Sequence, residues 1–223
     1  MNVDVTQETE WQYWESRWRR AAEGAKPGSG LVAQADDWLE RWLPLIRSRG
    51  ARTALDLGCG LGEDGLQLHA AGLAVTGMDY SPAGIALARQ LHPEITFVEG
   101  DLRDPLPFPD GSFDVVVSGF ALHYFRDAEM RRIVAEVRRV LTPKGLLIAR
   151  VNSTAAHDHG FGQGEEIEPR VFNVNGRIKR FFTADDVRKY LAGWHIVSLE
   201  HREVFRFRPG HAHWEVVALV SAL

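Results

Sequence analysis

Between residues 51 and 151 the chain alternates short apolar runs with amphipathic segments. Five runs are uninterrupted enough to predict buried strands, at 53–58, 73–79, 95–101, 113–119 and 145–151. Helical spacing of apolar positions fills the segments 64–72, 81–92 and 127–141. Strands that alternate with helices predict a parallel sheet with helices on both faces, and strands apolar throughout suit burial on both sides.

The pattern changes after residue 151. The segment 151–169 is polar and glycine-rich and has neither strand nor helix periodicity. It leads into two short runs separated by Asn175-Gly176, the signature of a hairpin with a type I′ turn. A capped helix at 183–193 and strands at 195–204 and 213–223 follow. We therefore expect the C-terminal part to add a hairpin, a helix and two strands.

The N-terminal segment predicts helices set apart by a linker. Trp11, Trp14 and Trp18 stand at i, i+3 and i+7, which places them on one face of a helix. Residues 23–30 are typical of a linker, and a second helix is expected at 31–47. We expect this tryptophan face to pack onto the main domain.

Composition narrows the class of protein. Of the 223 residues, 45% are hydrophobic and 25% are charged, which is ordinary for a globular domain. The net charge of −4 argues against a protein that binds nucleic acids or anionic membranes. Cys59 is the single cysteine, so no intrachain disulfide can form. With neither a secretory signal nor a long apolar run in the sequence, we expect a cytoplasmic location.

The strongest chemical signal is the stretch LDLGCGLGEDG, residues 55–65. A strand ends in closely spaced glycines, which let backbone N–H groups approach a ligand. Gly60-x-Gly62-x-x-Gly65 with Asp79 further on matches a dinucleotide fingerprint, which favours a nicotinamide-dependent oxidoreductase. Gly58-x-Gly60-x-Gly62 after Asp56 matches a second pattern.

That second pattern resembles the class I S-adenosylmethionine (SAM) dependent methyltransferases. Gly100-Asp101 after the third strand, the run FDVVVSGFALHYF at 113–125 and the closing helix and strands fit the same family. The resemblance implies an α/β, Rossmann-like, doubly wound sheet of seven strands, mostly parallel with an antiparallel last strand. It implies a helical cap over residues 1–50 and a methyltransferase domain over 51–223. A dehydrogenase would need a substrate domain for which the chain has no room.

The resemblance also assigns residues to the cofactor. Asp79 would accept both ribose hydroxyls, Tyr80 would pack against the adenine, and Asp101 and Leu102 would bracket the adenine edge. The remaining expected cofactor contacts are Tyr13, Trp18, Asp56, Gly58, Cys59, Gly60, Gly62, Ser118, Gly119 and Phe120. Tyr13 and Trp18 enter because the N-terminal segment is similar to that of thiopurine- and tellurite-type methyltransferases, where such a helix covers the crevice.

The methyl acceptor is expected beyond the fourth strand. His123 and Tyr124 are the candidate catalytic residues, and Trp14, Asn152 and His157 are expected to contact the acceptor. The Asn/Asp-Pro-Pro-aromatic motif of amino-methylating DNA enzymes and the paired-glutamate loop of protein arginine methyltransferases are missing, which favours a small-molecule acceptor. A SAM-binding module that acts through a partner and does not catalyse remains the alternative.

Residues 151–182 leave the expected carboxyl end of the fifth strand, the edge at which ligands bind in open parallel sheets. They could form a lid over the acceptor, a plain surface insertion or a metal site. His157-x-His159 and His211-x-His213 each place two imidazoles together, but no carboxylate at a recognised spacing completes either set. We therefore expect a lid and no metal.

Overall fold

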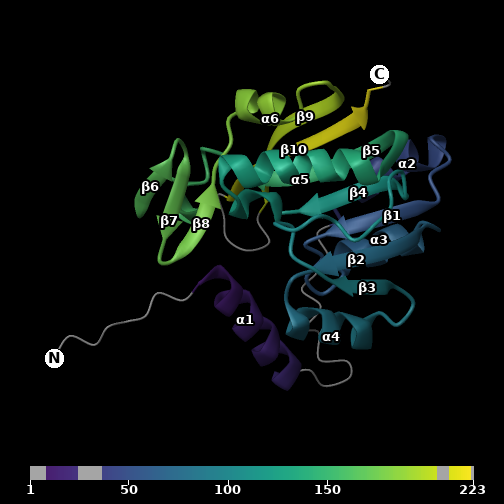
Figure 1. Ribbon diagram of the computed structural model, residues 1–223, viewed down its shortest axis with the longest axis horizontal. Helices are drawn as coiled ribbons and strands as arrows, with labels where there is room; N and C mark the ends of the chain where they lie inside the picture. Colours follow the sequence, from purple (N-terminus) through teal and green to yellow (C-terminus); the bar gives the residue numbers. More distant parts are fainter. Residues whose placement is uncertain (1–8, 25–36, 205–210, 222–223) are drawn as a thin grey trace.

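The computed structural model describes residues 9–24, 37–204 and 211–221 (Figure 1). Its main sheet has the strand order β3-β2-β1-β4-β5-β10-β9. The strands are β1 Thr53–Leu57, β2 Ala74–Asp79, β3 Thr96–Glu99, β4 Phe113–Gly119, β5 Leu141–Asn152, β9 Trp194–Val204 and β10 His211–Val220. Neighbours from β3 to β5 pair in parallel, and β10 is antiparallel to both β5 and β9. The predicted seven-stranded, doubly wound fold with an antiparallel last strand is confirmed.

Helices cover both faces of this sheet. Helices α2 Leu43–Ser48, α3 Glu63–Ala70 and α4 Pro82–Leu91 pack on one face, and α5 Asp127–Val140 and α6 Ala184–Tyr190 pack on the other. Ile133 of α5 and Leu68 of α3 are fully or almost fully buried on opposite sides. The apolar side chains of β1, β4 and β5 point alternately into the two cores, which explains their uninterrupted hydrophobic runs.

The described residues between 9 and 50 do not form one helical cap, as was expected for residues 1–50, but fall into two separate parts. The second expected helix, 31–47, lies partly outside the described residues, and its described part is a 3-10 turn, Glu40–Trp42, followed by α2. Trp38, Leu39 and Ile46 pack into the core beside the sheet. This segment therefore belongs to the main body, and α1, Glu10–Gly24, alone among the described N-terminal elements stands beside α4 (Figure 1).

A second, three-stranded sheet is built from the segment after β5 (Figure 1, green). It consists of β6 Glu165–Glu168, β7 Val171–Val174 and β8 Arg177–Arg180. Asn175 and Gly176 have φ of 54° and 83°, as a type I′ turn requires, so the predicted hairpin is confirmed. Strand β6 was not predicted from the sequence. Phe161, Phe172 and Phe181 form a separate small core beneath this sheet.

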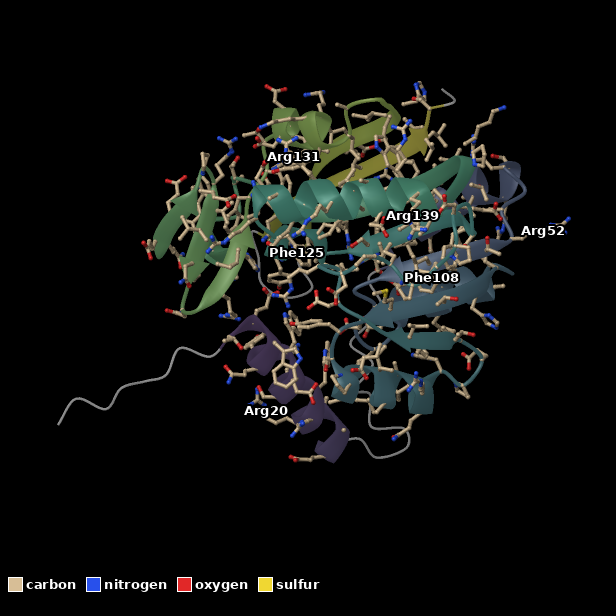
Figure 2. All side chains as sticks on the ribbon, viewed as in Figure 1. Arg20, Arg52, Phe108, Phe125, Arg131 and Arg139 are labelled. Atoms are coloured by element: carbon tan, nitrogen blue, oxygen red, sulfur yellow. The ribbon has the colours of Figure 1, made fainter. Side chains whose placement is uncertain are left out.

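The loop after β3 is fastened to α5. Arg139 donates hydrogen bonds to the carbonyl oxygens of Leu106 and Phe108, and it also pairs with Asp110 (Figure 2). The first residues of the same loop, from Gly100 to Arg103, line the cavity described below. Among the described residues no helix combines the length and apolar character needed to cross a membrane.

Candidate active site

A cavity of about 1150 Å³ opens at the carboxyl ends of β1, β2, β4 and β5. In open parallel sheets this edge, where the strand order reverses, is where ligands bind. The loop after β1 forms the floor, and α1 and β8 close the opposite side. The cavity is therefore made from segments that lie far apart in the sequence, from Thr9 to His211.

The loop after β1 forms the floor because its glycines leave parts of the backbone uncovered by side chains. Gly58 and Gly60 have φ of 70° and 52°, which glycine adopts without strain. The N–H groups of Gly58 and Cys59 both bond to the carbonyl oxygen of Met78, at 2.8 and 3.1 Å, which fastens β1 to the end of β2. A Cβ on Gly58 would collide with the Cβ of Ala121, so this position admits glycine alone.

Two buried carboxylates brace this loop. Asp56 Oδ2 accepts a hydrogen bond from the Gly65 N–H at 3.0 Å and so positions the start of α3. Asp79 Oδ2 accepts from the Gly60 N–H at 3.0 Å, and Asp79 Oδ1 accepts from the Ser81 N–H at 2.9 Å. Burial raises the pKa of both carboxyls above the usual value.

Asp79 also tests whether the cavity suits a nucleoside. Each carboxylate oxygen can accept about two hydrogen bonds, and one backbone bond to each oxygen leaves capacity for two more donors. Asp79 lines the cavity, so this capacity faces open space at the end of β2. Two vicinal hydroxyls of a ribose match it, and the residues therefore fit SAM.

The wall next to Asp79 contains Tyr80, Asp101 and Leu102. Tyr80 donates its hydroxyl hydrogen to the carbonyl oxygen of Glu10, at 3.2 Å, and so contacts the start of α1. Asp101 pairs with Arg103 at 2.7 Å. Although burial alone would raise the pKa of Asp101, the hydrogen bonds from Arg103 hold it below the usual value.

Helix α1 is anchored by one carboxylate. Glu15 is 5% exposed, and its Oε2 accepts hydrogen bonds from the Ser81 hydroxyl at 2.6 Å and from the Ala83 N–H at 3.2 Å. Ser81 is the N-cap of α4, so the carboxylate lies at the positive end of that helix. Burial opposes ionisation, but the bonds from Ser81, Arg19 and Ala83 lower the pKa of Glu15 overall. Glu15 is thus charged at neutral pH.

The anchored helix places an indole over the floor of the cavity. Trp18 lies so close to Gly60 and Gly84 that a Cβ on either glycine would approach its ring to 3.2 and 2.9 Å. Trp14 stacks on Trp18 with ring centroids 5.5 Å apart, and Arg17 lies over both rings. The face marked by tryptophans in the sequence therefore packs against the cavity through Trp14 and Trp18, while Trp11 is 44% exposed.

Replacing Glu15 by glutamine should loosen α1. The amide cannot keep the charge-assisted bonds to Ser81 and Arg19, and losing them costs about 1–3 kcal/mol. We expect a lower melting temperature and about tenfold weaker SAM binding, because Trp18 then covers Gly60 for less of the time. Calorimetry and thermal unfolding check both effects. Glu23→Gln, an exposed site on the same helix, is the matched control and should change neither.

The other end of the cavity is lined by aromatic rings and histidines. Phe120 and His123 follow β4, and Tyr124 stands T-shaped to Trp14 at 6.2 Å. His211 of β10 stacks on Phe120 at 4.7 Å, and His159 stacks on His211 at 3.7 Å. The segment after β5 therefore reaches the cavity through His159.

Most sequence-predicted site residues line this cavity, and three do not among the described residues. Gly62 caps α3 with φ of 86°, and its Cβ position is filled by Phe97. Ser118 is fully buried and donates to the carbonyl oxygen of Leu57 at 3.1 Å, which links β4 to β1. His157 is exposed and touches Phe161 edge-on. The residues that do line it are Tyr13, Trp14, Trp18, Asp56, Gly58, Cys59, Gly60, Asp79, Tyr80, Asp101, Leu102, Gly119, Phe120, His123, Tyr124 and Asn152.

Sequence reasoning missed His211, His159, Lys179 and Arg150, which all line the cavity. Arg150 lies between the rings of Trp38 and Phe120, at 4.1 and 4.6 Å from their centroids. The order of strands in this fold could have shown that residues of the last strand lie beside the end of the fifth. In this fold the last strand pairs with the fifth, and the register here sets His213 opposite Asn152.

The two histidine pairs do not come together as a metal site. His157 is exposed and lies outside the cavity lining, whereas His159 and His211 stack face to face with their planes 12° apart. In residues 9–24, 37–204 and 211–221 no three His, Cys, Asp or Glu side chains converge as a metal would need.

Acid should destabilise the fold through His211. Burial, and then His159, lowers its pKa to about 3, so the unfolded chain binds a proton below pH 6.5 that the folded chain does not. Its stabilising contribution is complete above pH 6.5 and is lost as the pH falls toward 3. Glu10, whose pKa burial raises to about 8, acts in the opposite direction, so a variant comparison is needed.

Denaturant unfolding at pH 7.5 and 5.0 measures this effect. The wild-type chain should lose about 1–2 kcal/mol more of its free energy of unfolding than His211→Gln over this interval. Equal losses in the two chains would contradict a buried neutral imidazole.

Comparison with known proteins finds matches over the central part of the chain. A family model described as a methyltransferase domain matches residues 54–145, the segment from β1 to the start of β5. The match is to a methyltransferase domain and covers less than half of the 223 residues. The methyltransferase domain contains the glycine loop, Asp79, Asp101 and His123, and the cofactor of its class is SAM.

Relatives agree over the same region. The chain is 40% identical over 92 residues to an uncharacterised methyltransferase of Synechocystis, covering 41% of this chain and 43% of the relative. It is 37% identical over 117 residues to demethylmenaquinone methyltransferase of Thermus thermophilus, covering 50% and 52%. The matches thus span about half the length of these relatives. A SAM-dependent methyltransferase of Methanosarcina mazei has the same fold, with a TM-score of 0.68, 24% identity and coverage of 81% and 98%.

Proposed function

We propose that this protein transfers a methyl group from SAM to a small-molecule acceptor and releases S-adenosylhomocysteine. The observation that carries the proposal is one continuous cavity with two chemically different ends. One end presents the glycine loop and the buried Asp79, and the other presents aromatic rings and histidines. A cavity that only bound SAM would not need the second end.

The cofactor half is assigned residue by residue. Asp79 holds the ribose hydroxyls, Tyr80 packs against the adenine, and Asp101 and Leu102 contact the adenine edge. Trp18 covers Gly60 from above. When bound, SAM supplies a methyl group on a positively charged sulfur, which leaves as a neutral thioether. The protein orients the acceptor and excludes water, which suffices for an in-line displacement.

The acceptor half is assigned to His123, Tyr124, Trp14 and Asn152. His123 is 3% exposed, and its Nδ1 has no hydrogen-bond partner among the described residues. Burial, with His211 and Lys179 nearby, lowers its pKa well below the usual value, so it is neutral at physiological pH. A neutral imidazole can hydrogen-bond an uncharged acceptor group. Small molecules suit this enclosed end, and a cytoplasmic location fits the single cysteine.

Release of S-adenosylhomocysteine tests this function. Purified protein is incubated with SAM and a panel of small-molecule acceptors, and wild type is compared with His123→Gln. We expect turnover with one acceptor class, about 10–100-fold less in the variant, and equal affinity of both chains for S-adenosylhomocysteine. SAM binding without turnover on any panel member would favour a non-catalytic binding module instead.

A further inference from the structure

His211 has a defined proton arrangement. Its Nε2 lies 3.1 Å from Asn152 Oδ1, an oxygen that only accepts hydrogen bonds, so Nε2 carries the hydrogen and donates it. The ring is neutral, because burial lowers its pKa to about 3. A neutral imidazole carries one N–H, so Nδ1 keeps a lone pair. Nδ1 is buried and has no partner among the described residues.

A buried nitrogen in this state costs free energy unless a donor meets it. His211 is 7% exposed, and it lines the cavity beside Phe120. The rings of Phe120 and His159 both stack on the His211 imidazole. A ligand can therefore contact His211 only through a hydrogen bond at the edge of its ring. The same end holds His123, with a second unpartnered Nδ1.

Three cations line this end of the cavity, with Glu10 and Asp64 as the nearby acidic residues. Arg150 lies over Phe120, Lys179 donates to the carbonyl oxygen of His159 at 2.9 Å, and Arg177 lies over Tyr13 at 4.2 Å. All three line the cavity. A cationic acceptor would be repelled here. The walls next to these cations are the rings of Trp14, Phe120 and Tyr124, which favour stacking with a flat molecule.

We propose that the acceptor is a flat, uncharged aromatic compound whose hydroxyl or ring N–H donates a hydrogen bond to Nδ1 of His211. Asn152 is the positioning residue that fixes the proton on Nε2. This inference rests on the proposed function and names its substrate class. It excludes ammonium compounds. Their nitrogen has no lone pair with which to accept the methyl group, and the cations at this end repel their positive charge. The cations at this end would attract a carboxylate, but a carboxylate has no hydrogen to donate to Nδ1 and so cannot make the proposed contact.

Binding to the 223-residue chain saturated with S-adenosylhomocysteine tests the class without turnover. Four matched probes are titrated by calorimetry: 2-naphthol, 2-methoxynaphthalene, 2-naphthoate and protonated 2-naphthylmethylamine. We expect 2-naphthol to bind about tenfold more tightly than 2-methoxynaphthalene, which has the same ring without the donor. Protonated 2-naphthylmethylamine, which the cations repel, and 2-naphthoate, which cannot donate to Nδ1, should both bind more weakly than 2-naphthol.

Variants locate the contact. His211→Phe should bring the affinity for 2-naphthol down to that for 2-methoxynaphthalene, whereas His211→Gln, which keeps an acceptor atom, should retain part of the preference. Asn152→Leu should reduce the preference, because nothing then holds the proton on Nε2. His195→Phe, at an exposed histidine of β9, is the matched control. Unchanged affinity for S-adenosylhomocysteine shows that each variant is folded.

The outcomes separate the two proposals. No binding of S-adenosylhomocysteine to the wild type would overturn the proposed function itself. Normal binding of S-adenosylhomocysteine with no preference for 2-naphthol, or with tighter binding of either ion, would overturn the acceptor class alone. A preference that survives His211→Phe would overturn the role of His211.

Discussion

Replacing Asp79 by asparagine should weaken SAM binding by about 10²–10⁴-fold. The carboxylate already accepts the N–H groups of Gly60 and Ser81, and in the proposed complex it accepts two ribose hydroxyls as well. Hydrogen bonds to a charged group contribute about 1.5–3 kcal/mol each. An asparagine also turns an NH₂ group toward one of the two backbone N–H donors, so the end of β2 and the glycine loop move apart.

Calorimetric titration with SAM measures this loss. Asp104→Asn is the matched control, since Asp104 is an exposed carboxylate on the loop that follows Asp101. It should bind SAM as the wild type does. Near-normal SAM affinity of Asp79→Asn would show that the ribose does not lie against this carboxylate.

Shortening residues 153–168 should abolish methyl transfer and leave SAM affinity nearly unchanged. The deletion removes His159 from its stack on His211 and Phe161 from the small core under β7 and β8. The acceptor end would then open to water. Helix α1 keeps its anchor, because Glu15 bonds to Ser81 and Ala83 and not to this segment.

Single substitutions refine this result. His159→Ala removes one ring at the cavity and should lower turnover about tenfold, while His157→Ala, the exposed neighbour two residues away, should have no effect. S-adenosylhomocysteine production and SAM affinity are measured for all three variants. Wild-type turnover in the shortened chain would show that the segment is a plain surface insertion.

The strands of the main sheet could be predicted because burial on both faces leaves a direct trace in the sequence. The hairpin was equally accessible, since Asn175-Gly176 is a turn with few alternatives. Strand β6 could not be found this way. Its sequence, Glu-Glu-Ile-Glu, is largely exposed at the edge of a small sheet and lacks an apolar face.

That the residues around the glycine loop line one cavity was predictable, because they follow their strands directly. The opposite end of the cavity was not predictable, because His159, Lys179 and His211 meet only through tertiary packing. The spacing of the histidine pairs in the sequence suggested a metal site, whereas in the structure His159 and His211 stack on each other. His157 was chosen over His159 since nothing in the sequence distinguishes the exposed ring from the one that faces the cavity.

Titration of the wild-type chain with S-adenosylhomocysteine and, separately, with NAD tests the central claim most directly. The glycine loop fits both cofactors by sequence, so the comparison discriminates between them. We predict one S-adenosylhomocysteine bound per chain and no heat of binding with NAD. Binding of NAD, or failure to bind S-adenosylhomocysteine, would contradict the assignment of this cavity to methyl transfer.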